Sequence, residues 1–284
     1  MKGYSSGLSN TLRVKVAAVA PHLSSFIPHL SFFRLILRKF SSSMGQITPY
    51  NEQESKTKQV SRMFDRIAPY YDFLNHFLSL GIDRGWRRKA IAEVAQHQPQ
   101  RILDIATGTA DLAIAMAESI KPQEVIGVDI APKMLEIGRV KVRDKGLSKT
   151  VHLEDGDSQE LHFKDNEFDA VTAAFGVRNF ENLEQGLSEM YRVLKPGGKI
   201  VVLEFSKPKV FPFKQLFNLY FKYLLPTIGR FTSNDQRAYA YLYESVQVFP
   251  EGEVFLNIFE KTGFKSNRCT ALTLGVCSIY VGYK

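Results

Sequence analysis

From Arg101 to Phe205 the sequence alternates short apolar runs with longer stretches of helical character. Strand-like runs that alternate with helices of about 10–15 residues predict βαβ units and a parallel sheet. Because crossovers between parallel strands are right-handed, such units build a doubly wound open sheet, which binds its ligands beyond the carboxyl ends of the strands. The apolar runs are 101–105, 124–130, 151–154, 168–174 and 199–205, and the helical stretches are 111–119, 132–145 and 183–194.

The segments outside this pattern predict further helices and a closing hairpin. We expect a helix over 61–81 that passes into an aromatic loop, an amphipathic helix over 83–96, helices inserted over the sheet within 210–243, and a helix over 253–262. Two strands around Gly275, over 270–274 and 278–283, would add an antiparallel hairpin to the sheet edge. The predicted organisation is a leader or disordered extension over 1–43 and a single domain over 44–284, made of an N-terminal helical cap (44–98), a cofactor-binding core (99–208), a helical lid (209–250) and a closing helix and hairpin (251–284).

The net charge of +8 comes mostly from the first 43 residues. Six of the 37 basic residues and none of the 29 acidic residues lie there, so that 31 basic and 29 acidic residues, a net charge of +2, remain from Met44 onward. A nucleic-acid-binding protein usually carries its basic surface on the folded domain itself. The charge distribution therefore argues against nucleic acid as a partner.

The basic leader has two interpretations. It lacks acidic residues, is rich in Ser and Arg, and contains an amphipathic stretch over 32–40, as an organellar transit peptide does. A transit peptide would place the protein in the mitochondrial matrix. Alternatively, the segment is an unstructured extension, or precedes a genuine start at Met44, and the protein is cytoplasmic or peripheral at the inner face of the membrane.

No segment has the composition of a transmembrane helix, a disulfide framework or a metal site. The chain contains no run of about 18 uncharged apolar residues. Neither Cys269 nor Cys277 has metal-ligand spacing, so we expect no disulfides, no metal and a reducing compartment. Lone histidines with no ligand spacing are usually structural, and four of this kind are His76, His97, His152 and His162.

Polar residues follow three successive strands and predict a nucleoside site. Asp104 to Asp111 forms a turn of small residues around Gly108, where a ligand could approach the backbone and the N–H groups of the next helix. This turn lacks the GxGxxG pattern, and by itself it is equally well an ordinary tight turn. Asp129 ends the second strand, where an acid accepts from ribose hydroxyls, unless it is only a helix cap or a surface residue. The segment DGDS (155–158) follows the third strand, where a carboxylate would accept from the adenine amino group, with Ser158 behind it. Three such loops without a diphosphate signature favour S-adenosylmethionine as the ligand.

Six segments resemble the ubiquinone/menaquinone C-methyltransferase family, and within it the bacterial demethylmenaquinone enzymes. The similarity runs from about Thr48 to the last residue, and the chains of those enzymes begin near the position of Met44, which favours an extension or a misplaced start for residues 1–43. The resemblance implies a class I S-adenosylmethionine-dependent methyltransferase with a doubly wound, mostly parallel seven-stranded sheet, a C-terminal antiparallel hairpin and a helical lid insertion. The segments are FDRIAPYYDFLN (64–75), LSLGID (78–83), FDAV (168–171), FGVRN (175–179), MYRVLKPGG (190–198) and LEFSKP (203–208).

The family's functional residues fall on two groups of positions. The resemblance implies that Thr109, Asp129, Asp157 and Ser158 bind the cofactor, with Asp104 and Gly108 in the first loop, and that Tyr71, Arg178 and Asn179 surround the reacting ring. Arg178 could otherwise be a surface arginine, and Tyr71 a packing aromatic. Two departures from the family pattern concern the cofactor. Ala110 stands where glycine is usual, and Ala174 stands where some members have a serine.

The implied reaction is transfer of a methyl group to a ring carbon of demethylmenaquinol, giving menaquinol, with a prenylated quinol as substrate. Other readings are C-methylation of a ubiquinone precursor, another small-molecule methyltransferase, or a cofactor-binding scaffold that has lost catalysis. Nucleic-acid amino-methyltransferases carry an Asp/Asn-Pro-Pro-aromatic motif where residues 174–177 read AFGV. Residues 211–225 mix aromatics with lysines and form either a membrane-surface element or a buried lid helix. A homodimer is left open.

Overall fold

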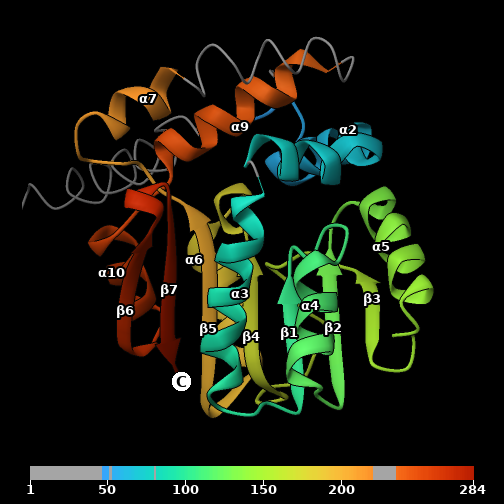
Figure 1. Cartoon of the computed structure of the whole chain (residues 1–284). Helices are drawn as coiled ribbons and strands as arrows, with labels where there is room; N and C mark the ends of the chain where they lie inside the picture. The colour runs from blue at the N-terminus through green and yellow to red at the C-terminus, as the bar shows by residue number, and fades with distance from the viewer. Residues whose placement is uncertain (1–46, 51–52, 80, 220–234) are drawn as a thin grey trace, which may run out of the picture. The chain divides into compact units, whose positions relative to one another are not determined.

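Seven strands of the described residues form one sheet in the order β3-β2-β1-β4-β5-β7-β6 (Figure 1). This computed structural model describes residues 47–50, 53–79, 81–219 and 235–284. The first five strands are parallel, and β7 lies antiparallel between β5 and β6. The mostly parallel sheet with a closing antiparallel hairpin is confirmed. The strands are β1 (Arg101–Ile105), β2 (Glu124–Asp129), β3 (Val151–Asp155), β4 (Phe168–Ala174), β5 (Leu194–Phe205), β6 (Lys265–Leu272) and β7 (Cys277–Tyr283).

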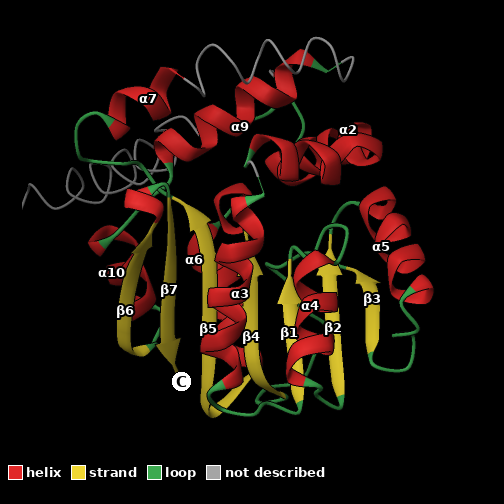
Figure 2. Ribbon diagram, in the orientation of Figure 1, coloured by secondary structure: helices red, strands yellow, loops and turns green. Residues whose placement is uncertain are grey.

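Helices cover both faces of this sheet, as the nearly continuous apolar sequences of its central strands require (Figure 2). The helices α3 (Ile82–Ala95), α4 (Asp111–Ile120) and α5 (Pro132–Asp144) pack on one face, and α6 (Leu183–Val193) and α10 (Glu253–Lys261) pack on the other. The strand order reverses between β1 and β4, so the cleft of a doubly wound sheet opens above their carboxyl ends.

The two N-terminal helices occupy different places. Helix α2 (Lys56–Leu78) lies across the carboxyl ends of the strands, whereas α3 joins the layer beside β5 (Figure 1). The sequence prediction grouped both helices into a cap. The difference arises because α3 buries Trp86 and Val94 in the main core of the sheet.

Helix α2 also begins earlier than the sequence predicted, at Lys56 instead of Ser61. The side chain of Ser55 accepts a hydrogen bond from the backbone N–H of Lys58, at 3.4 Å, as an N-cap does. The helix then continues through Pro69. The start of α2 was therefore signalled by a serine in the polar entry segment.

Two further helices lie over the strand ends, α7 (Phe213–Leu219) and α9 (Gln236–Val248), and a short 3-10 turn, η1 (Val177–Asn179), follows β4. Residues 220–234, between α7 and α9, lie outside the described part. The closing hairpin turns through η3 (Thr273–Gly275), and β6 begins at Lys265, five residues earlier than predicted. Residues 47–284 form one compact unit. None of the helices in the described ranges is long and apolar enough to cross a membrane.

Candidate active site

A cavity of about 620 Å³ lies beneath α2 at the carboxyl ends of the parallel strands. Strand ends, turns and α2 all contribute to its lining. Several residues that the sequence singled out separately are therefore brought together in one cavity. Its lining includes Tyr71, Gly108, Asp129, Asp157, Ser158 and Asn179.

The turn between β1 and α4 uses left-handed backbone at three positions, of which the first, Ala106, has a φ of +54°. Gly108 has a φ of +57° and Ala110 a φ of +65°. A glycine adopts this conformation freely, whereas a residue with a Cβ pays about 1 kcal/mol. Ala110 is fully buried as the residue that precedes α4. The alanine that departs from the family pattern is thus held in the backbone conformation of a glycine.

Asp129 fixes this turn in addition to lining the cavity. Its carboxylate accepts hydrogen bonds from the backbone N–H of Gly108, at 2.8 Å, and of Ala131, at 2.9 Å. Burial raises the pKa of Asp129 to about 6, and these backbone donors oppose the shift. The N-cap position of α5 belongs to Ala131. Contact of Asp129 with a ribose stays a prediction.

Asp104 and Thr109 line a second cavity, of about 350 Å³, which shares Tyr71 and Gly108 with the first. The carboxylate of Asp104 accepts from the hydroxyls of Thr107, at 2.7 Å, and Thr172, at 2.6 Å. Burial raises the pKa of Asp104 to about 6. Asp104 therefore holds the loop together, and any contact with the cofactor's methionine end would add to that role.

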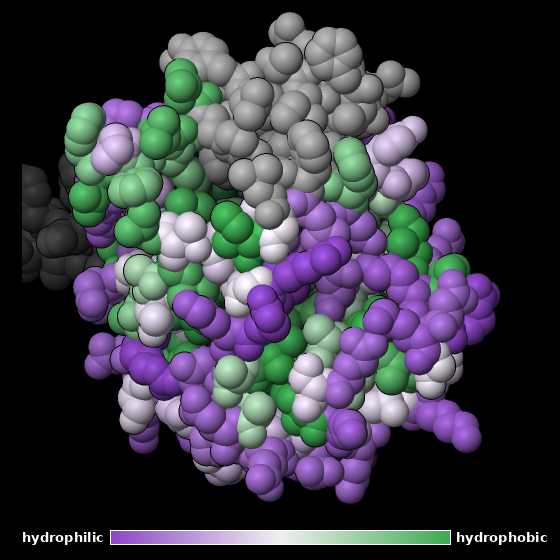
Figure 3. Space-filling view, viewed as in Figure 1, coloured by the Kyte–Doolittle hydropathy of each residue, from purple (hydrophilic) through white to green (hydrophobic). Residues whose placement is uncertain are grey.

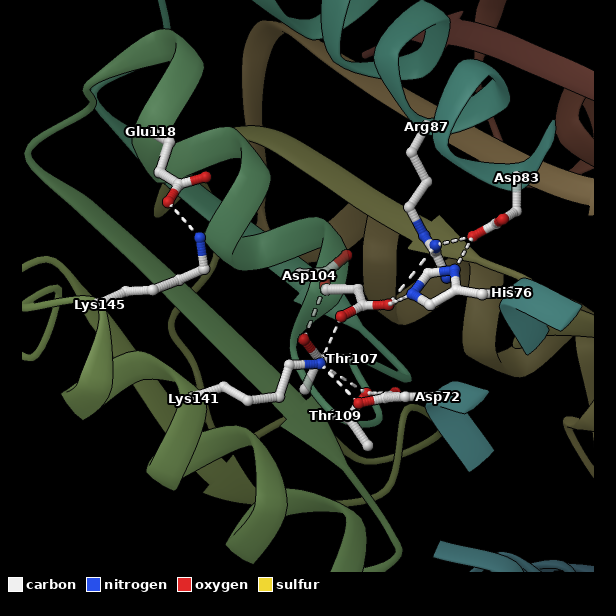
Figure 4. Close-up of polar contacts among 11 residues, drawn as sticks. Asp72, His76, Asp83, Arg87, Asp104, Thr107, Thr109, Glu118, Lys141 and Lys145 are labelled. Atoms are coloured by element: carbon white, nitrogen blue, oxygen red, sulfur yellow. Dashed lines mark hydrogen bonds and ion pairs between the residues drawn. The ribbon is translucent and has the colours of Figure 1, made fainter. Parts of the chain in front are cut away.

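A network of charged side chains joins α2 to this second cavity (Figure 4). Lys141 of α5 contacts Asp72 at 2.9 Å and also pairs with Asp111, while the hydroxyl of Thr109 donates to Asp72. A second branch runs through α3, where Arg87 pairs with Asp83 and Asp111, and Asp83 accepts from His76 at 2.9 Å. No sequence motif indicated this network. Its one local signal was the four-residue spacing of Asp83 and Arg87, which brings opposite charges together on a helix.

Asp157 and Ser158 line the larger cavity next to the end of β3. The carboxylate of Asp157 accepts from the backbone N–H of Gln159, at 2.9 Å, which fixes the loop. Ser158 is buried. By contrast, Asp155 is exposed and pairs with Arg139. The structure thus selects the second aspartate of the DGDS segment as the one that faces the cavity.

The three residues predicted around the reacting ring do not share one orientation. Tyr71 and Asn179 line the large cavity, and burial raises the pKa of Tyr71. The guanidinium of Arg178 instead points to buried Glu204, at 2.6 Å, and to the carbonyl of Phe175, and Arg178 is absent from the lining. One guanidinium nitrogen of Arg178 is thus held by a fully buried carboxylate, whereas its Nε has no partner among the described residues. The role of Arg178 at the reacting ring stays a prediction.

A partly buried lysine ties α2 to the turn that carries Arg178. Lys56 donates to the carbonyl oxygens of Arg178, at 3.3 Å, and Phe180, at 3.0 Å. Burial lowers the pKa of Lys56 to about 8, although nearby Glu181 opposes the shift. No sequence pattern indicated this contact, which joins residues more than 120 positions apart.

Among the residues that the structure places, no group of three or more His, Cys, Asp or Glu side chains could hold a metal ion. The polar lining fits a nucleoside instead, because carboxylates at Asp129 and Asp157 can accept from hydroxyl and amino groups.

The fold is shared with solved methyltransferases of low sequence identity. A S-adenosylmethionine-dependent methyltransferase from Thermotoga maritima matches with a TM-score of 0.51 and 19% identity, over 78% of this chain and 99% of that chain. Phosphoethanolamine N-methyltransferase 2 of Haemonchus contortus, solved with S-adenosylmethionine, also has a TM-score of 0.51 and 19% identity, over 69% of this chain and 52% of that one. The sheet and its strand-end cavity are those of a class I S-adenosylmethionine-dependent methyltransferase.

Sequence relatives are much closer. The model of the ubiE/COQ5 methyltransferase family matches residues 52–284, and the chain belongs to this family. Demethylmenaquinone methyltransferase of Bacteroides fragilis is 49% identical over 239 residues, 84% of this chain and 98% of the relative. The enzyme of the same name from Deinococcus radiodurans is 48% identical over 236 residues, 83% and 97% of the two chains. Ubiquinone/menaquinone biosynthesis C-methyltransferase UbiE of a Geobacter species is 46% identical over 230 residues, 81% and 97%.

Proposed function

We propose that this protein transfers the methyl group of S-adenosylmethionine to a ring carbon of demethylmenaquinol, giving menaquinol. The observation that carries the proposal is the single cavity that joins Asp129 and Asp157 to Tyr71 and Asn179. The relatives named demethylmenaquinone methyltransferase, at 48–49% identity over nearly their whole length, support the choice of acceptor.

The reaction balances with no additional reactant. The ring carbon attacks the methyl group, the carbon–sulfur bond breaks, and its electron pair stays on sulfur to give S-adenosylhomocysteine. The ring carbon then loses its proton, so that one proton is released for each methyl group transferred. Alignment of donor and acceptor can supply roughly 7–11 kcal/mol of the barrier reduction.

In this proposal the cofactor lies along the strand ends. Asp129 accepts from the ribose hydroxyls, and Asp157 with Ser158 binds the adenine. The second cavity, with Gly108, Thr109 and Asp104, receives the methionine end. The shared lining of the two cavities supports this placement, because one elongated ligand can occupy both.

The acceptor's hydroxyl becomes a better electron donor to the ring as it loses its proton. Arginine cannot take up that proton, because its pKa exceeds about 12. Arg178 instead stabilises the developing negative charge, and Glu204 holds the guanidinium in place from the opposite side. Asn179 and Tyr71 orient the hydroxyl.

The test uses purified protein, labelled donor and a panel of short-tailed naphthoquinols and benzoquinols. Preferential methylation of the naphthoquinol supports the proposal. Preference for a benzoquinol supports the ubiquinone-precursor alternative, which the Geobacter relative's name also covers. If the protein binds S-adenosylmethionine but methylates no quinol, the result supports the alternative of a cofactor-binding scaffold that has lost catalysis.

A prenylated substrate implies contact with a membrane, and we place that contact at a patch around α7, on the cytoplasmic side of the membrane. Figure 3 shows apolar side chains gathered over α7, at the upper left of the view. Lys207 donates to Glu251 and to the carbonyl of Gln247, so the chain entering α7 lies beside the end of α9 and the start of α10. Exposed aromatics beside lysines are typical of an interfacial element. The patch comprises Val210, Phe211, Phe213, Leu216, Leu219, Val248, Val254 and Leu274.

A further inference from the structure

Three buried polar atoms near the candidate acceptor site have no hydrogen-bond partner among the residues described. They are Arg178 Nε, Asn179 Oδ1 and the hydroxyl oxygen of Tyr241. Buried polar groups in folded proteins are almost always hydrogen-bonded, so each such atom calls for a partner that the described residues do not supply. Two of the three atoms lie on η1 and the third lies on α9, which contacts η1.

Tyr241 comes from the lid helix and reaches the same region from above. Helix α9 packs against η1, which carries Arg178 and Asn179. The ring of Tyr241 is fully buried in a cluster with Met63 and Ile67 of α2, against which Tyr71 also packs. Charges of Arg178 and Glu204 both act on its hydroxyl. Tyr241 therefore packs in the same cluster as Tyr71 and lies on the helix that contacts the turn carrying Arg178, a position that no sequence motif indicated.

The unpartnered atoms have a specific hydrogen-bonding pattern. Arg178 Nε–H and the Tyr241 hydroxyl are donors, and Asn179 Oδ1 is an acceptor. A phenolic hydroxyl donates one hydrogen bond and accepts two, so it complements this set. When the phenol ionises, the two donors remain to stabilise its oxygen. Burial raises the pKa of Tyr241, which keeps its own hydroxyl protonated as a donor.

We propose that Tyr241 binds the quinol hydroxyl next to the reacting carbon, and that its O–H, together with Arg178 Nε–H, donates to that oxygen while Asn179 Oδ1 accepts from it. The proposal rests on the proposed function and adds a residue of the lid to the acceptor site. It also gives α9 a role, since the acceptor oxygen would be enclosed only when this helix lies against η1.

The test is Tyr241→Phe, which deletes only the hydroxyl. Loss of a hydrogen bond to a charged oxygen lowers kcat/KM for the quinol by about 10- to 100-fold. The Kd for S-adenosylhomocysteine stays within about twofold of wild type. Because the hydroxyl has no partner among the described residues, the thermal midpoint of Tyr241→Phe is expected to equal or exceed that of wild type. A variant that unfolds, or melts clearly lower, overturns the proposal by revealing a structural partner.

Two further measurements separate the outcomes. Tyr243 lies two positions after Tyr241 on α9, on another side of the helix. The control variant Tyr243→Phe is therefore expected to keep wild-type kcat/KM. Inhibitors that carry the ring hydroxyl should bind wild type about tenfold more tightly than inhibitors that lack it. For Tyr241→Phe this difference in affinity should be much smaller. Equal kcat/KM for wild type and Tyr241→Phe overturns this inference alone, and leaves the proposed function standing. Failure of wild type to methylate any quinol removes both.

Discussion

Arg178 and Glu204 form an ion pair in which the arginine nitrogen lies 2.6 Å from a carboxylate oxygen that is fully buried. Burial raises the pKa of Glu204, and the charge of Arg178 opposes the shift. The pair joins the turn after β4 to the end of β5, two strands that are neighbours in the sheet. It therefore couples the position of a candidate catalytic residue to the core of the sheet.

Glu204→Gln should be strongly destabilising. The variant keeps the shape of the side chain but leaves Arg178 buried without a carboxylate, and removing one partner of a buried pair costs about 3–5 kcal/mol. Urea unfolding of both proteins measures the difference. Glu189→Gln, which breaks the more exposed pair with Arg192, is the control and should cost no more than about 1 kcal/mol. Similar losses of unfolding free energy in the two variants would contradict a larger contribution from the buried pair of Glu204 and Arg178.

Arg178→Lys should reduce turnover far more than cofactor affinity. Lysine keeps the positive charge but loses the planar set of donors that spans Glu204 and the acceptor oxygen. We expect kcat to fall by about 100-fold, the scale found when one donor to a developing oxyanion is removed. Steady-state kinetics and calorimetric titration with S-adenosylhomocysteine measure the two quantities. Near-normal turnover would remove Arg178 from the mechanism.

Cofactor affinity should depend on pH through Asp129. Its pKa is raised from the ordinary value of 3.8 to about 6, so the carboxylate that accepts from ribose is lost as the pH falls below about 6. Affinity for S-adenosylhomocysteine should therefore weaken from pH 7 to pH 5 in wild type. Asp129→Asn should bind weakly with a flatter profile. An unchanged slope in Asp129→Asn would assign the dependence to another group, of which Asp104 is the first to test.

The same two raised pKa values predict the sign of a stability change in the free protein. Between 3.8 and about 6 the folded state retains protons on Asp104 and Asp129 that the unfolded state releases. These carboxyl groups therefore lower the free energy of unfolding as the pH rises through this window, and their contribution is constant above it. Replacing both with Asn should remove this part of the pH dependence.

Gly138→Ala should disturb the turn between β1 and α4, where we propose that the methionine end of the cofactor binds. A Cβ at this position would lie 2.8 Å from the side chain of Leu153, and 3.2 Å from both the Ala110 side chain and the Thr109 backbone. Overpacking of this kind costs about 1–3 kcal/mol, and here the Leu153 side chain must move and the turn must give by a few tenths of an ångström. We expect weaker binding of S-adenosylhomocysteine. Gly85→Ala is the matched control, because its Cβ would meet nothing within 4 Å on α3 and should stabilise the helix.

Loss of liposome binding should follow from changes on the α7 surface. Phe211 is 76% exposed and Leu216 is 56% exposed, whereas Phe217 on the same segment is buried. The double variant Phe211→Ser/Leu216→Ser should float less with anionic vesicles while keeping its thermal midpoint. Val140→Ser removes an exposed apolar side chain from α5 and should float like wild type. Equal flotation of all three proteins would exclude the α7 patch as a membrane contact.

The order of strands and helices was accessible from the sequence because each element depends on residues near to it. Strands β1 and β4 have the bounds that their apolar runs predicted, and most helices of the core end within about two residues of expectation. The strand ends then placed Asp129 and Asp157 at one edge, since parallel strands finish together. Helix α2 was less well predicted, because its first turn depends on a cap at Ser55 in a polar segment.

The direction of the side chains was decided only by tertiary structure. The sequence determined that an arginine follows the fourth strand, but only the folded chain shows that its guanidinium pairs with the buried carboxylate of Glu204, 26 positions away. Likewise, Lys141 meets Asp72 of α2 across 69 positions, and Tyr241 reaches η1 through packing between α9 and α2. Local periodicity carries no information about such pairs, because their energies depend on distances that exist only after the sheet and its covering helices have assembled.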